Sequence, residues 1–432
     1  MNEQIIAKYQ EQINLHYKKV DEHRRIDNSF STPEDEPLTE DEIKQIDDYW
    51  GKYRFAYPNI DYKSFQTFKN RSGIFDVRHC PGAIRTEYFS KHFVNQSYTM
   101  AFQNKALLSR LFPKVNMPKT IIRRMSGMYY DEDYNYISKG KAIEICKEFI
   151  ELAGKAIFKP SGKSGGSGIV FVKKEELETG GVESAFKNMG INAFVVQEVL
   201  VQSDFMKAFN STSVNTVRVT SLLYKEQIKV LAALIRIGKE GNKVDNYCSG
   251  GGILGLDVET GVTNNWAMSN DHRRITVLSN GLDLESRKLE VPNWNKIIEL
   301  VTQSHLSIPY IKMISWDIAL TADNTPTMIE CNFAGMIQIH EAVTGPLFGE
   351  LMDKLLDEYL IEKFYLTKAS EDFIYKEYSD YCIITDYIGD MNSCIVPDSL
   401  DNKIVGKIEG KALEKIKECK QYSISNRLEQ IC

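Results

Sequence analysis

The sequence has few cysteines, no close cysteine pair and no long apolar run. Its eight cysteines are scattered over 432 residues without a C-x-x-C pattern. That spacing supports neither a zinc site nor a disulfide framework, and it favours reduced cytosolic thiols. No stretch approaches the ~18 apolar residues of a membrane span, and the polar start MNEQIIAKYQEQ does not have the pattern of a signal peptide. We therefore expect a cytoplasmic protein without a membrane span.

Excess positive charge is also absent. The net charge is −6 at pH 7, which argues against broad binding to nucleic acid but permits a local basic pocket. At 432 residues the chain exceeds the usual size of one domain, so we expect two or three lobes. The oligomeric state does not follow from the sequence.

Helical and strand-like patterns alternate along the chain. Residues 1–27 have apolar residues near helical spacing, and Thr39 with Glu42 forms a capping box that predicts a second helix. Residues 55–100 are aromatic and basic, the middle of the chain alternates strand-like runs with turns, and the pattern weakens past residue 366. Further helices are predicted at 105–112, 137–149, 297–305, 349–359 and 410–418. These patterns predict an α+β or mixed α/β fold.

One predicted hairpin brings oxygen-bearing side chains together. Two strand-like runs, ISWDIAL and TMIECN, are separated by the polar turn TADNTP. With the turn centred between Asp323 and Asn324, Asp317 lies opposite Glu330, and Asn332 points to the same face. Two carboxylates and an amide oxygen are ligands that a hard cation such as Mg²⁺ prefers. The hairpin is therefore a candidate metal site.

A glycine-rich loop joins two other strand-like runs. Residues 156–172, AIFKPSGKSGGSGIVFV, place Lys159 just before this loop. Glycines let backbone amides approach an anion closely. The segment is not a P-loop, because the first glycine of that motif would fall at Ile157 and because the loop enters a strand instead of a helix. A plain hairpin loop with an exposed Lys163 explains the segment about as well as a phosphate-binding flap does.

The order of the motifs is more informative than any one of them. Residues 195–200, VVQEVL, suit backbone contacts to an adenine edge, although an ordinary buried strand has the same pattern. The order resembles the ATP-grasp superfamily over about residues 104–349: Lys159 with its loop, VVQEVL, Asn215-x-x-Arg218, then Asp317…Glu330-x-Asn332. The phrases MPKTIIRRMSGMYYDED, NTVRVTS, VDNYCSGGGILGLDVETG and GPLFGELMDKLL are similar to its sugar-transfer associated branch, which is linked to polysaccharide assembly.

The resemblance implies a mixed α/β (α+β) fold in which two lobes with antiparallel sheets grip ATP. It also implies ATP and Mg²⁺ as cofactors, with two magnesium ions. Four regions follow along the chain: a helical and aromatic, substrate-facing region at 1–103, a small lobe with the flap at 104–200, a large lobe with the metal site at 201–365, and a C-terminal extension at 366–432.

The resemblance also implies roles for individual residues. The phosphate-binding lysines correspond to Lys105 and Lys159, the flap to Gly165, Gly166 and Gly168, and the adenine hinge to Gln197, Glu198, Val199 and Leu200. The nearest candidate for the ribose-binding acid is Asp204, although a solvated loop residue is as plausible there. The metal ligands correspond to Asp317, Glu330 and Asn332.

The chain departs from the superfamily pattern at one position. Many of these ligases have a catalytic arginine two residues before the first metal aspartate, where this chain has Ser315. Arg218, and after it Arg236, are the expected replacements because both lie on strand-like runs and because a guanidinium group suits phosphate or carboxylate. Lys159 completes the expected catalytic set. A structural salt bridge is the alternative for each arginine.

Substrate residues are predicted more loosely. The acceptor site is assigned to Asn246, Ser249 and Gly251, although a plain turn explains these residues about as well, and to Arg85. Arg85 belongs to a basic cluster that would bind an anionic sugar or would be ordinary surface charge, made of Arg71, Arg78, His79 and Arg85. We expect His340 to be packed and Cys331 to point away from the metal face of its strand.

The leading hypothesis is a Mg-ATP-dependent carboxylate–amine ligase that forms ADP through an acyl phosphate. The implied substrates are a small or sugar-linked carboxylate, for example a uronic acid of a capsule or other polysaccharide precursor, and an amine. A kinase for a sugar hydroxyl is the first alternative, because Ser315 replaces the expected arginine. A non-catalytic ATP-binding module of a glycan-assembly complex is the second.

Overall fold

A computed structural model describes residue 18 and residues 28–53, 60–162, 166–241, 251–333, 337–356 and 358. The chain divides into two compact units, one of residues 1–92 with 345–432 and the other of residues 93–344. The helix expected at 410–418 and nearly all of the one expected at 1–27 lie outside the described residues. The division into four regions at residues 103, 200 and 365 remains a prediction.

Short helices packed on aromatic side chains form the described part of the first unit. They are α2 (Glu40–Trp50), the 3₁₀ turn η1 (Gly51–Tyr53), α3 (Tyr62–Ser72), the π-helical η2 (Ile84–Phe89) and α12 (Leu351–Leu355). The predicted capping box is confirmed, because the Glu42 amide donates to Thr39 Oγ1 and the Thr39 amide donates to the Glu42 carboxylate. Trp50 is fully buried and donates its indole N–H to the Val77 carbonyl.

The second unit contains two antiparallel sheets, and the first has six strands in the order β3-β2-β1-β6-β4-β5. The strands are β1 (Thr120–Met125), β2 (Met128–Tyr130), β3 (Tyr136–Ile137), β4 (Lys155–Pro160), β5 (Val170–Lys173) and β6 (Phe194–Glu198). The helices α7 (Lys139–Ala153) and α8 (Gly181–Met189) pack against it. The turn η3 (Lys174–Glu176) follows β5.

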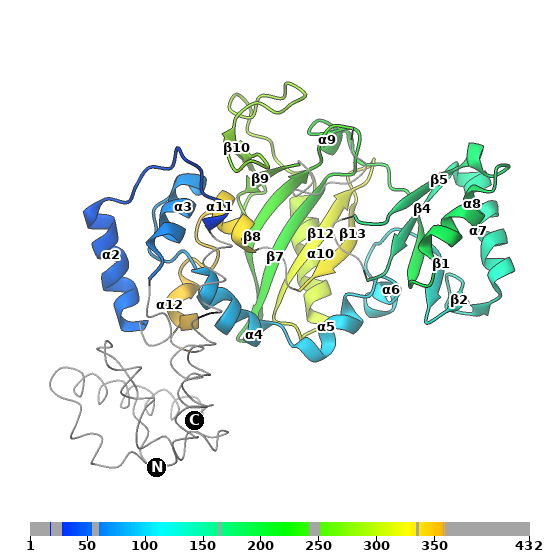
Figure 1. Cartoon of the computed structure of the whole chain (residues 1–432), viewed down its shortest axis with the longest axis horizontal. Coiled ribbons are helices and arrows are strands. Elements are labelled where there is room, and N and C mark those ends of the chain that lie inside the picture. Colours follow the sequence, from blue (N-terminus) through cyan, green and yellow to red (C-terminus); the bar gives the residue numbers. More distant parts are fainter. Residues whose placement is uncertain are drawn as a thin grey trace, which may run out of the picture. The chain divides into compact units, whose positions relative to one another are not determined.

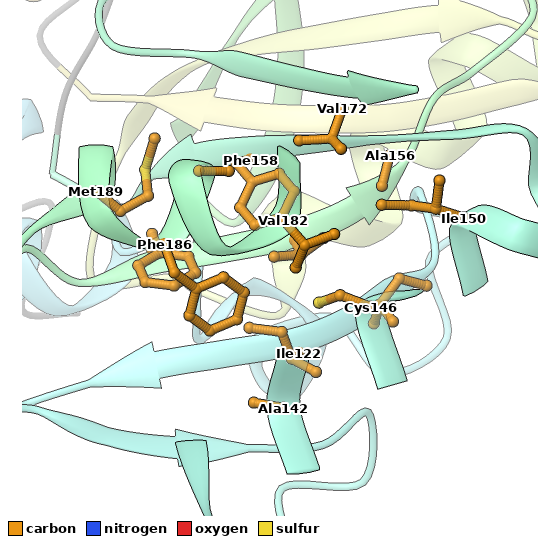
Figure 2. Close-up of a cluster of buried hydrophobic side chains, with 14 residues drawn as sticks. Ile122, Ala142, Cys146, Ile150, Ala156, Phe158, Val172, Val182, Phe186 and Met189 are labelled. Carbon is orange, nitrogen blue, oxygen red and sulfur yellow. The ribbon is translucent and has the colours of Figure 1, made fainter. Parts of the chain in front are cut away.

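One face of this sheet packs on the helices through a buried apolar cluster. Figure 2 shows Phe158 of β4 meeting Val182 and Phe186 of α8, and Phe194 belongs to the same buried cluster. Each such aromatic side chain contributes roughly 1.5–3 kcal/mol of burial free energy. Because neighbouring residues of a strand point to opposite faces, Lys159 lies on the face away from these helices.

The second sheet has seven strands in the order β11-β10-β9-β8-β7-β12-β13, and its neighbouring pairs are antiparallel. Figure 1 shows β8, β7, β12 and β13 side by side. The strands are β7 (Thr216–Tyr224), β8 (Gln227–Ile237), β9 (Gly252–Leu256), β10 (Thr263–Met268), β11 (Arg274–Ile275), β12 (Met313–Leu320) and β13 (Pro326–Asn332). The helix α4 (Ser90–Phe93) crosses the division between the two units at residue 92. Further described helices of the second unit are α5 (Gln96–Phe102), α6 (Leu108–Leu111), α9 (Asp204–Lys207), α10 (Trp294–Leu306) and α11 (Ile337–Thr344).

Two helices cover opposite faces of the larger sheet. His305 of α10 hydrogen-bonds Ser221 of β7 at 2.7 Å, and His340 of α11 hydrogen-bonds Thr220 at 3.1 Å. Since consecutive residues of β7 point to opposite faces, α10 and α11 lie on opposite sides of this strand. Arg218, two residues before Thr220 on β7, therefore points to the same face as Thr220, the face that α11 contacts.

The predicted fold class is confirmed, because the second unit combines helices with two antiparallel sheets. Among the residues that the structure describes, no helix has both the length and the apolar composition needed to cross a membrane.

Candidate nucleotide and metal site

The hairpin of β12 and β13 has the predicted register at its polar end. Asp317 pairs with Glu330 and Ser315 pairs with Asn332. The turn, however, is centred on Asp323, because Leu320 pairs with Pro326. A β-bulge between these pairs leaves Ile329 unpaired and restores the predicted alignment. The predicted pairing is thus confirmed, although the predicted turn centre is off by half a residue.

The three predicted metal ligands meet on one face of the hairpin. Asn332 Nδ2 lies 3.2 Å from Asp317 Oδ2 and 3.5 Å from Glu330 Oε1. Cys331, between Glu330 and Asn332, points to the other side, where it is buried and its thiol contacts the Phe102 carbonyl. Burial raises the pKa of this thiol, which disfavours the thiolate. The expectation that Cys331 is a packing residue is confirmed.

Two arginines from neighbouring strands converge on Asp317. Arg218 of β7 stands directly opposite Asp317 and forms a bidentate pair with it, with Nε–Oδ1 at 2.7 Å and Nη2–Oδ2 at 2.8 Å. Arg236 of β8 adds an Nη1–Oδ2 contact of 2.9 Å. Asp317 is 1% exposed. Burial alone would raise the pKa of its carboxyl, but the charges of Arg218 and Arg236 outweigh burial and lower the pKa to about 2.

A lysine reaches the second carboxylate. Lys105 Nζ lies 3.2 Å from Glu330 Oε2, and both side chains are about four-fifths buried. The preceding residue Asn104 accepts the Ala106 amide with its side chain at 3.0 Å, which shapes the backbone around Lys105. The site therefore holds two carboxylates and three cationic groups, so it carries excess positive charge suited to a phosphate-bearing ligand.

Ser315 is buried, and its hydroxyl is hydrogen-bonded to a neighbouring side chain. Its Oγ lies 2.8 Å from Thr220 Oγ1, which in turn contacts His340 Nε2 at 3.1 Å. Burial first, and the nearby charge of Arg218 second, lower the pKa of His340 to about 3. The histidine is therefore neutral at pH 7, and the expectation that His340 is a packed residue is confirmed. The guanidinium groups beside Asp317 come from β7 and β8 instead of from position 315.

The asparagine of the Asn215-x-x-Arg218 motif has a structural role. Asn215 is fully buried, donates to the carbonyls of Met206 and Asn210 and accepts the Gly238 amide at 3.0 Å. These bonds hold the chain on either side of β7. Arg218 therefore points to the face with Asp317, while Asn215 fixes the start of the strand that carries Arg218.

The predicted phosphate lysine and hinge lie on the smaller sheet. Lys159 of β4 pairs with Val195 of β6. Gln197 points to the same face and donates to Thr120 Oγ1 at 2.9 Å. The Glu198 amide already donates to the Lys119 carbonyl at 3.0 Å, so that N–H is not available to adenine without a change of partner. The roles of Val199 and Leu200 remain predictions.

The flap joins two antiparallel strands, as predicted, because β4 pairs with β5. Gly165 lies outside the described residues. Gly166 and Gly168 have φ of 73° and 76°, a left-handed conformation that favours glycine. These two positions therefore favour glycine for conformational reasons, and their contact with a ligand remains a prediction.

Asp204 has the surroundings of a solvated residue. It is the first residue of α9, its side chain is 97% exposed, and it pairs with Lys207 at 2.8 Å. That hydrogen bond lowers the pKa of its carboxyl. The alternative of a surface residue fits these contacts better than a ribose-binding role does.

The substrate candidates divide between undescribed and locally partnered residues. Asn246 and Ser249 lie outside the described residues, and Gly251 begins the next described stretch. Arg85 is buried in the first unit and donates to the Cys80 carbonyl at 3.0 Å. Its role toward a substrate remains a prediction.

The basic cluster of the first unit is not a shared surface patch. Arg71 pairs with the buried Asp35, Arg78 pairs with Asp76, and His79 stacks on Phe68 with ring centroids 5.4 Å apart. Arg71 and His79 are buried. The surface-charge alternative is wrong for these two residues, because each has a local partner in the interior.

The oxygen donors fit a magnesium ion in part. Among the described residues, no group of three or more His, Cys, Asp and Glu side chains is arranged to hold a metal. Asp317, Glu330 and an amide oxygen of Asn332 are nevertheless hard donors, and Mg²⁺ commonly takes one or two carboxylates and completes its six ligands with phosphate and water. Oδ1 of Asp317 accepts Arg218 Nε at 2.7 Å, and Oδ2 accepts donors from Arg218, Arg236 and Asn332.

Sequence reasoning missed the residues that hold the site together. Thr220 and Arg123 lie within the phrases NTVRVTS and MPKTIIRRMSGMYYDED, but neither they nor Asn116 and Tyr134 were assigned a role. The one available signal was an arginine within the apolar run TIIRRM, since Arg123 is only 2% exposed. Buried arginine is rare unless it is paired or otherwise satisfied.

The fold and this site together define an ATP-grasp protein. Residues 89–352 match the family described as sugar-transfer associated ATP-grasp, and this chain belongs to that family. No curated protein matches the chain.

Solved structures with a related fold are distant. The ATP-grasp ligase PsnB, solved with a minimal precursor, is 15% identical with a TM-score of 0.35, covering 60% of this chain and 62% of PsnB. The D-cycloserine synthetase DcsG is 10% identical with a TM-score of 0.36, covering 61% and 73%. D-alanyl-alanine synthetase A from Vibrio cholerae is 11% identical with a TM-score of 0.34, covering 59% and 64%. This chain thus spans about three fifths of PsnB, and similarity this distant carries no argument about substrate or reaction.

Proposed function

We propose that this protein is a Mg-ATP-dependent carboxylate–amine ligase that forms ADP and modifies a sugar or polysaccharide precursor in the cytoplasm. The observation that carries the proposal is the convergence of Asp317, Glu330 and Asn332 with Arg218, Arg236 and Lys105 on one face of the larger sheet. Membership in the sugar-transfer associated family supports a sugar-linked substrate. Polysaccharide and capsule assembly are the context that we propose for it.

The cationic residues suit the negative charge of the proposed reaction. A carboxylate is a poor electrophile, and transfer of the γ-phosphoryl group to it gives an acyl phosphate with phosphate as leaving group. Lys105 and Lys159 would hold nucleotide phosphates, while Arg218 would offset charge on the acyl phosphate with its planar fork. Magnesium, when bound by Asp317, Glu330 and Asn332, would neutralise the transferring phosphoryl group.

Arg218 takes the place of the arginine missing at position 315. It lies directly across from Asp317, and the pair uses its Nε and Nη2 but not its Nη1. The buried Ser315 contacts Thr220. The site therefore keeps a guanidinium group although position 315 is a serine. The kinase alternative rested on this serine alone, so the argument for it is weaker.

An assay of products with substrates in all combinations tests the proposal. Purified protein with ATP and Mg²⁺ should release ADP and inorganic phosphate only when a uronic acid or nucleotide-sugar acid and an amine are both present. AMP as the product would contradict the acyl-phosphate mechanism. A stable phosphorylated sugar without free phosphate would establish the kinase, and equal, negligible turnover by the wild type and Asp317→Ala would establish a non-catalytic module.

A further inference from the structure

Residues 104–119, here called the bridging segment, connect the metal hairpin with the smaller sheet. Besides the Lys105–Glu330 pair, the Asn116 carbonyl accepts the Met328 amide at 2.9 Å, and Asn116 Nδ2 donates to Thr327 Oγ1 at 2.7 Å. At its far end, the Lys119 amide donates to the Glu198 carboxylate at 2.7 Å. The segment thus contacts β13 and the end of β6.

The same segment is held by one tyrosine of the loop between β2 and β3. The Tyr134 hydroxyl donates to the Ala106 carbonyl at 2.9 Å and lies 2.8 Å from Ser109 Oγ. Ala106 is buried and directly follows Lys105. The hydroxyl therefore fixes the peptide next to the lysine that reaches Glu330.

The ring of Tyr134 is fixed as firmly as its hydroxyl. The guanidinium carbons of Arg110 and Arg123 each lie 3.9 Å from the centre of this ring. Arg123 also donates to Ser109 Oγ at 2.8 Å and to the Asp131 carbonyl at 2.8 Å. Cation–π contacts of this kind are stronger where the cation is desolvated, as it is at Arg123.

The backbone of the loop is strained at this residue. Tyr134 has φ of 64°, a left-handed conformation that bulky side chains seldom adopt. The Asp131 carboxylate accepts hydrogen bonds from the amides of Asp133 and Asn135 at 2.9 Å and 2.8 Å, so the loop curves around this carboxylate. Such strain persists only where the surrounding contacts determine it, and it commonly accompanies functional positions.

Arg123 has an unusual partner set for a buried cation. It is 2% exposed, and its Nε is buried without a hydrogen-bond partner. Its guanidinium contacts two backbone carbonyls, the Ser109 hydroxyl and the Tyr134 ring. Burying a positive charge without a paired carboxylate costs free energy. The contacts of Arg123 join the loop that carries Tyr134 to Ser109 of the bridging segment.

We infer that Tyr134 is a positioning residue: with Arg123 it holds the bridging segment so that Lys105 faces Glu330 at the proposed nucleotide phosphates. The catalytic consequence rests on the proposed function, whereas the placement of Lys105 does not. One measurement therefore addresses Lys105 directly and a second addresses nucleotide binding.

The first measurement is the rate at which an acylating reagent labels Lys105, followed by peptide mass spectrometry without nucleotide. Tyr134→Phe keeps the ring and removes the hydroxyl, so labelling of Lys105 should rise about fivefold, the factor equivalent to one hydrogen bond of ~1 kcal/mol. Lys141, about half exposed on α7, is the internal control, and Tyr136→Phe, 65% exposed on β3, is the matched variant. An unchanged labelling rate at Lys105 would overturn the inference.

The second measurement is a double-mutant cycle on the Kd for Mg-ATP and on KM and kcat. Tyr134→Phe alone should weaken ATP binding and raise KM about fivefold with kcat nearly unchanged, and it should have no further effect in the Lys105→Ala background. Equal effects of Tyr134→Phe in both backgrounds would show that it does not act through Lys105 and would overturn the inference. Absence of ATP binding by the wild type would instead contradict the proposed function, and the labelling result would still decide the placement of Lys105.

Discussion

Two groups of arginines in this protein are arranged in opposite ways. Arg218 and Arg236 come from neighbouring strands and share one carboxylate, Asp317. In the first unit, Arg71 and Arg78 each have a separate acidic partner. Shared charge on a sheet face leaves excess positive potential, whereas separate pairs neutralise themselves. The difference teaches that convergence, more than the number of arginines, marks a candidate site.

The largest expected effect comes from removing the shared carboxylate. Asp317→Ala leaves Arg218 and Arg236 buried beside each other without a counter-charge, so the free energy of unfolding should fall by about 3–5 kcal/mol. Turnover measured as ADP release should be abolished because a proposed metal ligand is lost. Urea unfolding and the ADP assay check both effects, with Asp204→Ala as the exposed-aspartate control. A stability loss below ~1 kcal/mol would show that the three groups do not act as one network.

The next effect compares one arginine from each group. Arg218→Ala should lower kcat by roughly 10²–10³-fold, the range for removal of one preorganised donor. Arg78→Ala removes a partly exposed pair with Asp76 and should change stability by at most ~1 kcal/mol, with kcat within about twofold. Equal losses of kcat in the two variants would end the distinction between converging and separate arginines.

The pH dependence of stability tests whether the buried side chains of His340 and His305 are neutral in the folded protein. The pKa values of His340 and His305 are lowered by burial to about 3 and about 4, below the ordinary value near 6.5. The unfolded chain therefore binds more protons as the pH falls from about 6.5 toward these values, and each histidine should cost ~1.4 kcal/mol of stability per pH unit. Stability contributed by Asp317 is lost only lower, between its unfolded pKa near 3.9 and about 2.

Urea unfolding at pH 7 and pH 5 measures this slope. His340→Gln should reduce the loss between these pH values by about 2 kcal/mol, because one of the two histidines no longer takes up a proton on unfolding. The same pH slope in the variant and the wild type would show that His340 is not held neutral.

The smallest effect is expected at the position where the arginine is missing. Ser315→Ala removes the hydrogen bond to Thr220, which keeps its contact with His340, so stability should fall by about 1 kcal/mol. kcat should stay close to that of the wild type, because the guanidinium beside Asp317 comes from Arg218. A loss of kcat as large as that of Arg218→Ala would show that Ser315 takes part in catalysis.

The strands of the hairpin and the face of its polar residues were predictable from the sequence, but the exact pairing depends on more than the local pattern. Strand periodicity placed Asp317, Glu330 and Asn332 on one face. The pairing of Asp317 with Glu330 nevertheless depends on the bulge at Ile329, because the turn itself is centred on Asp323. Without that bulge Asp317 would face Ile329. Two departures from the simple pattern offset each other, and neither is visible in the residue types.

The basic residues of the first unit show where local patterns are insufficient. Arg71 and Asp35 are far apart in sequence yet form a buried pair, and His79 lies against Phe68. The helical period shows which side chains share a face within one helix, but it does not show which residues of separate helices and loops meet. A cluster in the sequence therefore did not predict a cluster in space.

Local patterns were enough to identify the strand runs, the glycines between β4 and β5 and the set of oxygen and cationic groups, because strand periodicity and glycine conformation are properties of a few neighbouring residues. The three-dimensional arrangement was needed to show that Arg218 lies across from Asp317, that Ser315 is buried beside Thr220, and that Tyr134 holds the segment of Lys105. Those facts follow from strand order and long-range packing, and such contacts join residues whose separation along the chain leaves no local signal.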